Sequence, residues 1–246
     1  TALAAQKPRL GIGEFTARKI APPKIDGKIE PGEWDKAFTT SGLIAPFEHE
    51  LHHAETTMSL GHDERNFYFL FLCRRTDAEW YLRKSVREND GYDYGDPSVE
   101  IWITPPTLVP ETYQNVINTY PAVLDQKMIP TRGYVAQGWK GNWQVAETET
   151  ETHYVIEAAI PIKDFGFDAV KSGDVWRFLM CRTAHGAKPR AQASWSITQA
   201  FSEIPQHPQV RLADDETVAQ LFNVTSVLTG NYRFPMAVVA PDKAGA

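Results

Sequence analysis

Residues 67–73 read Phe67-Tyr68-Phe69-Leu70-Phe71-Leu72-Cys73 and are apolar at every position. The run is short, rich in aromatic side chains, and preceded by turn residues at 63–66. Such a run predicts a strand that other parts of the chain cover on both faces. A doubly covered strand is expected at the centre of a sheet, with further strands on either side of it.

Residues 98–104 alternate between two kinds of side chain. Val99, Ile101 and Ile103 fall on one side of an extended chain, and Glu100 and Trp102 fall on the other. This pattern predicts a strand whose apolar side faces a core and whose polar side faces outward.

Strand signals recur along the chain at the spacing expected of a β-sandwich. The further expected strands are 16–20, 56–61, 113–120, 143–150, 152–160, 174–183, 193–198, 218–228 and 236–239. Pro31–Ala37 is expected to form one or two helical turns, because proline is tolerated at a helix start. The sequence therefore predicts an all-β fold, in which two antiparallel sheets pack as a β-sandwich with short helical turns.

Composition agrees with this fold and narrows the partners. Among 246 residues, 12 Phe, 9 Tyr, 7 Trp, 17 Pro and 16 Gly favour short strands and turns. The net charge of −6 gives no overall basic footprint for a nucleic acid. The apolar run 67–73 is far shorter than the roughly 20 residues of a membrane-spanning helix. We therefore expect neither a nucleic-acid partner nor a membrane span.

The ends of the chain and its two cysteines add three expectations. Residues 1–15 are expected to be a flexible leader, 16–240 a single domain, and 241–246 a linker or tail. The small residues Thr1–Ala5 resemble the end of a signal peptide, which indicates a secreted or periplasmic protein. Cys73 and Cys181 both lie in apolar strand-like runs, so two buried thiols are expected rather than a disulfide.

Five segments carry motifs in a definite order. They are a turn and a Trp-bearing segment at 25–37, a strand, Asp turn and aromatic strand at 57–69, an acidic loop and Glu-bearing strand at 96–103, a strand and turn at 156–166, and Trp-bearing strands at 173–196. In this order they resemble the family 9 carbohydrate-binding modules and their DOMON-like relatives. The resemblance implies a jelly-roll-like β-sandwich that binds a saccharide or polysaccharide without catalysis. It also implies an accessory module, covalently linked to the catalytic domain of a secreted polysaccharide-acting enzyme.

The resemblance further implies a site in which two aromatic rings clamp the sugar. One clamp position falls on Tyr94, six residues before Glu100, and Glu100 matches a glutamate that bonds the sugar. The second falls in the loop after Trp195, where Phe201 is the nearest aromatic residue. The family uses tryptophans at both clamp positions, so this chain departs from the pattern there.

Polar positions of the binding face are also carried over by the resemblance. Gln114 and Asn118 match two of them, whereas the arginine of the family, two residues before Asn118, is Val116 here. The residues themselves suit a sugar, because C–H patches pack on aromatic rings while hydroxyls need carboxylate acceptors and amide donors. Glu100, Trp102, Gln114 and Asn118 supply that mixture on outward faces of the expected strands.

Residues 49–53, His49-Glu50-Leu51-His52-His53, match the His-Glu-x-x-His signature of zinc peptidases. The chemistry requires a helix, so that His49 and His53 share one face and Glu50 reaches the metal-bound water. The strand expected from residue 56 leaves room for about two turns, and no spacing indicates a third ligand. A zinc-dependent hydrolase is therefore an alternative function, and a loop with incidental histidines is the alternative structure.

Two other groups could be bound. A b-type haem in an electron-transfer domain needs ligands such as Met58, Met128 or Met180, which lie where apolar core residues are expected. The resemblance also implies a structural calcium ion, with oxygen ligands from turns such as Asp26-Gly27 or Asp63-Glu64. A glycosidase would need two carboxylates beside the sugar, and Glu100 with Asp93 or Asp96 would be the pair.

Overall fold

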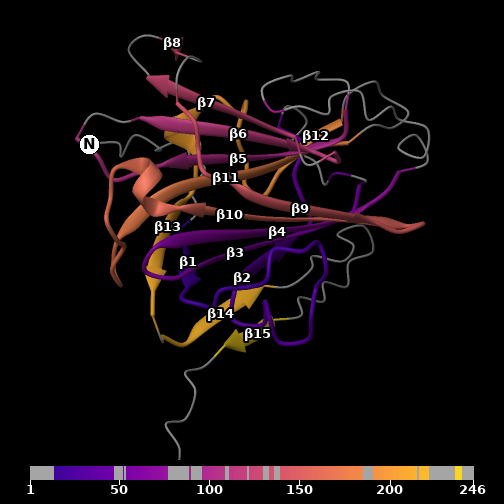
Figure 1. The fold of residues 1–246 in the computed structure, drawn as a ribbon, viewed down its shortest axis with the longest axis horizontal. Coiled ribbons are helices and arrows are strands. Elements are labelled where there is room, and N and C mark those ends of the chain that lie inside the picture. The colour runs from indigo at the N-terminus through magenta and orange to yellow at the C-terminus, as the bar shows by residue number, and fades with distance from the viewer. Residues whose placement is uncertain are drawn as a thin grey trace, which may run out of the picture.

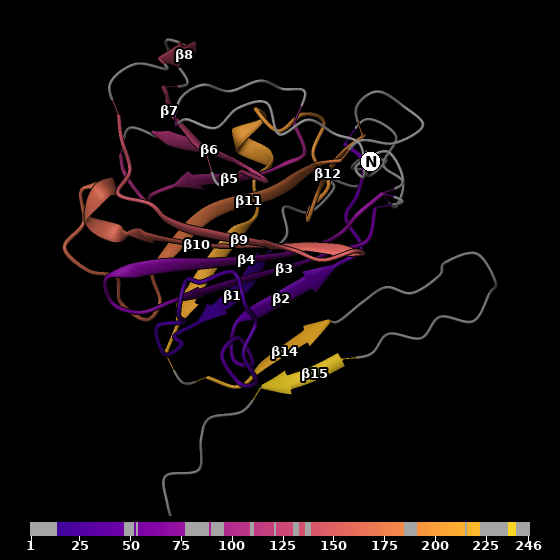
Figure 2. The same ribbon diagram turned by 45° about the vertical axis from the view of Figure 1, so that its right-hand side comes forward.

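The computed structural model describes most of the chain between residues 14 and 239. The described residues are 14–46, 52, 54–76, 89, 96–108, 111–120, 122–129, 133–135, 139–184, 191–214, 216–221 and 236–239. They form two stacked sheets, which Figures 1 and 2 show as separate layers with β5, β6, β7 and β11 in one and β3, β4, β9 and β10 in the other. The predicted β-sandwich is confirmed.

The large sheet holds eight strands. Their order is β1 (Glu14–Arg18), β13 (Gln209–Ala213), β11 (Val175–Ala184), β5 (Ser98–Thr104), β6 (Thr112–Asn118), β7 (Val123–Ile129) and β8 (Gly133–Val135), and β12 (Ala191–Ser194) pairs with β11. Neighbours run antiparallel except β1 and β13, which run parallel. The parallel pair joins strands from opposite ends of the described chain.

The small sheet holds five strands, all antiparallel. Their order is β2 (Phe38–Ser41), β3 (Thr56–His62), β4 (Asn66–Arg74), β10 (His153–Pro161) and β9 (Gln144–Glu149). A separate hairpin of β14 (Val218–Leu221) and β15 (Met236–Val239) lies beside β2, as Figure 2 shows. Two short 3-10 turns, η2 (Ile162–Phe165) and η3 (Ile204–Gln206), interrupt the strands.

The expected strands are present, with β5 and β15 at the predicted bounds, but the expected helical turns at residues 31–37 are wrong. That stretch forms turns, because Gly32 has φ 86°, outside the right-handed helical region. Strands β2, β7, β8 and β13 were not predicted; they are short or carry charged residues among the apolar ones. Within the described residues, no helix is long and apolar enough to cross a membrane.

The main core fills the space between the two sheets. Phe67 and Phe69 of β4 meet Phe178 of β11 with ring centroids 5.1 and 6.1 Å apart. The alternating side chains of β5 enter the same core, as the sequence predicted: Val99, Ile101 and Ile103 are all fully buried. Cys73 and Cys181 are free, buried thiols, also as predicted.

A second, smaller core covers the other face of the small sheet. Ile20, Trp34 and Ala37 pack there against Tyr68 and Leu70 of β4. The buried carboxylate of Glu157 anchors this segment, because it accepts hydrogen bonds from the Gly27 N–H at 2.8 Å, the Asp26 N–H at 3.1 Å and the Trp34 indole at 3.1 Å. The predicted Asp-Gly turn and its tryptophan thus serve to attach residues 20–37 to the sheet.

Gly27 is required at this turn for two reasons. Its φ of 79° lies in the left-handed region, where L side chains are strained. A Cβ atom at this position would also lie 2.6 Å from Oγ1 of Thr148 in β9. Only glycine therefore allows the turn to approach the edge of the small sheet this closely.

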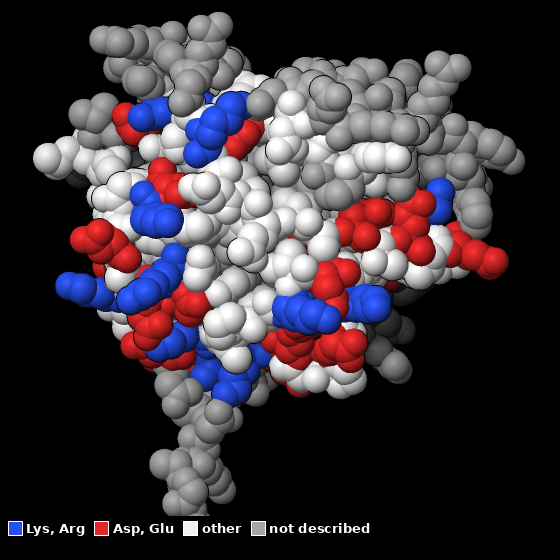
Figure 3. Space-filling view, viewed as in Figure 1, with Lys and Arg blue, Asp and Glu red and all other residues white. Residues whose placement is uncertain are grey.

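Charged residues on the face shown in Figure 3 are of both signs. Lys and Arg are interspersed with Asp and Glu around a central area without charge. The mixture leaves this face without a broad potential of one sign. Among the described residues, Lys127 pairs with Glu111 and Arg211 with Glu216, and such partly exposed pairs contribute little to stability.

Candidate functional site

The outer face of the large sheet carries the polar residues singled out in the sequence. Because Ile101 and Ile103 point into the core, their neighbours on β5 point the opposite way. The register then places Trp102 opposite Gln114, and Ser98 opposite Asn118, on β6. Four predicted site residues, Glu100, Trp102, Gln114 and Asn118, therefore share one sheet face.

Three of them form one hydrogen-bonded group. Oε2 of Glu100 accepts a bond from Nε1 of Trp102 at 3.1 Å and another from Nε2 of Gln114 at 3.0 Å. These bonds hold a carboxylate, an amide and an indole in fixed positions on adjacent strands. We call Glu100, Trp102 and Gln114 the polar triad.

Asn118 lies at the end of the same face and has a different set of partners. Its Nδ2 donates to Oδ2 of Asp96 at 3.3 Å, and its Oδ1 accepts from the backbone N–H groups of Tyr120 and Ala122. The amide oxygen therefore closes the turn between β6 and β7. Asp96, which enters this network from the loop before β5, is itself buried.

The polar triad is buried, although the sequence placed it on outward faces. Glu100 is 3%, Trp102 1% and Gln114 5% exposed. Part of the cover is the segment after Trp195, in which the His207 ring lies 5.7 Å from the Trp102 ring at an angle of 74°. Alternation along a strand predicts which face a side chain takes, but the burial of that face depends on distant segments.

Phe201, the predicted second clamp ring, belongs to this covering segment. Its side chain is 8% exposed and belongs to the same buried apolar cluster as Trp102, while its carbonyl oxygen lies 2.7 Å from Nε2 of His207. The first clamp residue, Tyr94, lies outside the described residues. Phe201 therefore lies in the covering segment with its side chain buried.

His207 is a site residue that the sequence analysis missed. Burial lowers its pKa to about 4, while the bond to the Phe201 carbonyl opposes this shift and the Arg177 guanidinium adds to it. The ring is therefore neutral at pH 7, and its Nδ1 atom is buried without a hydrogen-bond partner. No sequence signal marked His207, because a single histidine in a loop has no characteristic spacing.

Cys181 lies beside Glu100 in the pairing of β11 with β5. Burial, and then the charge of the Glu100 carboxylate, raises the pKa of the Cys181 thiol well above its usual value. The thiol is therefore protonated at neutral pH and unsuited to act as a nucleophile or metal ligand.

The zinc alternative falls largely on residues that are not described. His49, Glu50 and His53 lie outside the described residues. His52 is described; its backbone N–H donates to the Leu43 carbonyl, and its Nδ1 accepts from the Ala54 N–H. In the described part of the chain, no group of three or more His, Cys, Asp or Glu side chains is placed to hold a metal ion.

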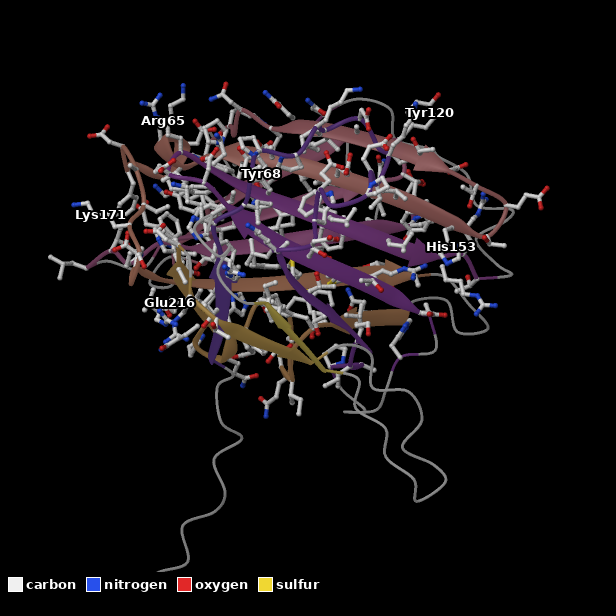
Figure 4. All side chains as sticks on the ribbon, turned by 90° about the horizontal axis from the view of Figure 1, so that it is seen from below. Arg65, Tyr68, Tyr120, His153, Lys171 and Glu216 are labelled. Atoms are coloured by element: carbon white, nitrogen blue, oxygen red, sulfur yellow. The ribbon has the colours of Figure 1, made fainter. Side chains whose placement is uncertain are left out.

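In the two turns suggested for calcium, the carboxylates of Asp63 and Asp26 have partners within the chain. Oδ1 of Asp63 accepts from the Arg65 and Asn66 N–H groups, and its Oδ2 accepts from the Tyr68 hydroxyl at 2.6 Å; Figure 4 labels Arg65 and Tyr68. Asp26 pairs with Lys24 at 2.7 Å. In both turns the carboxylate therefore already has partners within the chain.

The three methionines considered as haem ligands, and one further aromatic residue, take structural positions. Met58, Met128 and Met180 are all buried, as expected for apolar residues. Trp139 packs on Phe165, with ring centroids 5.8 Å apart, and its Nε1 donates to the Asp164 carbonyl. Aromatic residues in this part of the chain therefore build the core.

Comparison with known proteins places the chain in a family. Residues 25–200 match the family described as carbohydrate family 9 binding domain-like. The chain belongs to this family. The matched range includes Tyr94 and the whole polar triad, and it ends one residue before Phe201. A search of curated proteins finds no match to this family 9 domain.

Solved structures share its fold at low sequence identity. A candidate carbohydrate-binding protein from Bacteroides uniformis is 12% identical, with a TM-score of 0.65 over 81% of this chain and 99% of its own. A family 9 carbohydrate-binding module from Caldicellulosiruptor kristjanssonii, in complex with glucose, is 12% identical, with a TM-score of 0.59 over 82% and 96%. A module of the same family and organism, in complex with cellotriose, is 11% identical, with a TM-score of 0.54 over 82% and 94%. At these identities the likeness concerns the fold.

Proposed function

We propose that this family 9 domain binds a saccharide, without making or breaking a bond in it, at the outer face of the large sheet. The observation that carries the proposal is that the polar triad forms one fixed group within the matched family range. A carboxylate accepts hydrogen bonds from sugar hydroxyls, and an amide both donates and accepts them. Glu100 and Gln114 are the two groups proposed to bond the sugar.

Burial of the triad sets a condition for binding. A sugar ring reaches Glu100 only when part of the covering chain moves away, and the described part of that cover carries Phe201 and His207. The displaced segment would then present Phe201 to the ligand, together with Trp102, for packing against sugar C–H groups. The apparent affinity is reduced by whatever fraction of molecules is closed.

A second proposal concerns the wider role of the chain. We propose that the chain is an accessory module of a secreted polysaccharide-acting enzyme, with a secreted or periplasmic location. Support comes from the family match. A linked catalytic domain would then hold its substrate close because two sites on one chain bind the same polymer.

The test is a glycan array followed by calorimetry with glucose and cellotriose. Glu100→Gln keeps the size of the side chain but removes the carboxylate, so we expect at least a tenfold loss of affinity. Glu151→Gln is the matched control, because Glu151 is exposed and lies in the turn between β9 and β10 of the small sheet, outside the polar triad and its cover. Its affinity should stay within twofold of the wild type.

Two results would contradict the proposal. The first is a wild-type protein that binds none of the mono- and oligosaccharides tested. The second is equal binding by Glu100→Gln and wild type, which would place any saccharide site away from the polar triad.

A further inference from the structure

A pocket lies on the outer face of the large sheet, where β5 ends and β11 begins. It has a volume of about 220 Å³ and is lined by Thr104, Pro105, Pro106, Thr107, Val175, Arg177 and Gln209. Figure 4 labels Lys171 and Glu216, which lie near this end of β11 and β13. The volume is below the roughly 300 Å³ at which pockets for drug-sized ligands begin, so the pocket suits one small group.

Arg177 is the only charged residue among the residues that line the pocket. It is half-buried, and one of its guanidinium nitrogens donates to the His207 carbonyl at 2.9 Å. This bond fixes the guanidinium at the rim and uses one of its five N–H donors. Among the described residues, no carboxylate pairs with it.

Arg211, a neighbour on the same face, does pair with a carboxylate. Its guanidinium holds the Glu216 carboxylate with two parallel bonds, at 2.9 and 2.6 Å. Arg177 has the same fork-shaped donor set but meets only a carbonyl oxygen. A planar carboxylate from a ligand could form with Arg177 the same pair of parallel hydrogen bonds that Glu216 forms with Arg211.

The other pocket residues suit the body of such a ligand. Gln209, which pairs with Arg177 across β11 and β13, is half-buried and adds an amide beside the guanidinium. Val175 is 39% exposed, and Pro106 is exposed beside it in the lining, so one wall is apolar. A sugar ring that carries a carboxylate matches this combination, with its C–H face on the apolar wall.

We infer that the Arg177 pocket binds the carboxylate of an acidic sugar, such as a uronic acid residue. Arg177 bonds the carboxylate, Gln209 bonds a ring hydroxyl, and Val175 and Pro106 contact the ring. The choice of a sugar as the carrier of the carboxylate rests on the proposed function, whereas the carboxylate itself does not. The pocket and the polar triad have no residue in common, although the His207 ring lies against Trp102 and its carbonyl accepts the bond from Arg177.

The experiment is a calorimetric titration with glucuronic acid, glucose, acetate and a sulfated glucose. We expect glucuronic acid to bind the wild type and to lose at least tenfold in affinity in Arg177→Gln. Arg211→Gln is the matched control, because it removes the same charge from the same face, and its affinity should stay within twofold. Arg177 also bonds the His207 carbonyl of the covering segment, so the comparison is made within each background. The tenfold loss of glucose affinity caused by Glu100→Gln should be the same with and without Arg177→Gln.

Arg177→Lys is a second, more conservative variant that separates a loss of binding from a loss of folding. Thermal unfolding is measured for every variant. Lysine keeps the charge and a donor for the His207 carbonyl but loses the fork, so we expect glucuronic acid to bind at least threefold more weakly. Equal binding of glucuronic acid by Arg177→Gln and wild type would overturn the inference. If acetate binds as tightly as glucuronic acid, the claim that the pocket recognises the sugar ring is wrong. If the sulfated glucose binds more tightly than glucuronic acid, the claim that the pocket prefers a carboxylate is wrong.

A loss of glucose binding in Glu100→Gln, with glucuronic acid unaffected, would support both sites. Wild type that binds glucuronic acid through Arg177, but no neutral sugar, would contradict the polar triad as a saccharide site and leave the carboxylate pocket standing. The two proposals therefore fail separately.

Discussion

Substitution of Gly27 by alanine tests how residues 20–37 attach to the small sheet. Gly27 has φ 79°, and an added Cβ atom would lie 2.6 Å from Oγ1 of Thr148 and 2.9 Å from the Glu147 carbonyl carbon. Gly32 provides the matched control, because its φ is 86° but nothing lies within 4 Å of an added Cβ atom. The two positions share backbone strain and differ in close contact.

The expected cost follows from these two contributions. A left-handed backbone costs an L residue about 1–2 kcal/mol, and we expect this loss at both positions. Overpacking adds about 1–3 kcal/mol, and it applies at Gly27 alone because Thr148 and the β9 backbone must shift. The gain from a stiffer unfolded chain is similar for both variants, so it cancels in the comparison. Gly27→Ala should therefore be about 1–3 kcal/mol less stable than Gly32→Ala.

Urea unfolding, followed by tryptophan fluorescence, measures this difference in the free energy of unfolding. For a chain of this size the difference corresponds to about 2–12 °C in Tm, at about 2–4 °C per kcal/mol for 150–250 residues. Equal losses in the two variants would refute the reasoning, because the Gly27 turn would then not be held against β9. A loss at Gly32 larger than at Gly27 would refute it as well.

Two further predictions concern pH. Burial lowers the pKa of His207 to about 4. Below pH 6.5 the unfolded chain therefore binds a proton at this residue that the folded chain does not bind. The free energy of unfolding should fall by up to about 3 kcal/mol as the pH falls from 6.5 to 4. His207→Gln should flatten that part of the urea-unfolding profile, and profiles of equal slope would contradict the assignment. Burial alone would raise the pKa of Asp63, but bonds from Tyr68, Arg65 and Asn66 outweigh it and lower the pKa. Asp63→Asn should therefore lower the free energy of unfolding by about 1 kcal/mol at pH 7. The difference from the wild type should disappear below pH 3.8, as acid protonates Asp63 in the wild type. A difference that persists at pH 2 would contradict this role of Asp63.

Local patterns predicted a large part of the fold. Alternation along residues 98–104 was sufficient for both the bounds of β5 and the burial of Val99, Ile101 and Ile103. The unbroken apolar run at 67–73 likewise indicated β4, whose two faces meet the main core and the segment 20–37. These predictions succeeded because a strand has a period of two, and that period is visible in a few consecutive residues.

Pairings between distant residues could not be read in this way. The parallel contact of β1 with β13 joins residues almost 200 positions apart, and Glu157 meets its partner Gly27 across 130 positions. Neither has a local signature, because the free energy of each comes from contacts that exist only after the sheets have packed. The short strand β13 was missed for this reason, since its place between β1 and β11 decides its structure.

The candidate site divides in the same manner. The sequence by itself determined that Glu100 and Trp102 leave the core side of β5, and its motifs determined the family. Only the tertiary structure decided that Trp102 and Gln114 both bond one oxygen of Glu100, and that His207 covers them. Side-chain direction is a property of one strand, whereas burial and hydrogen-bond partners depend on what the rest of the chain brings to that strand.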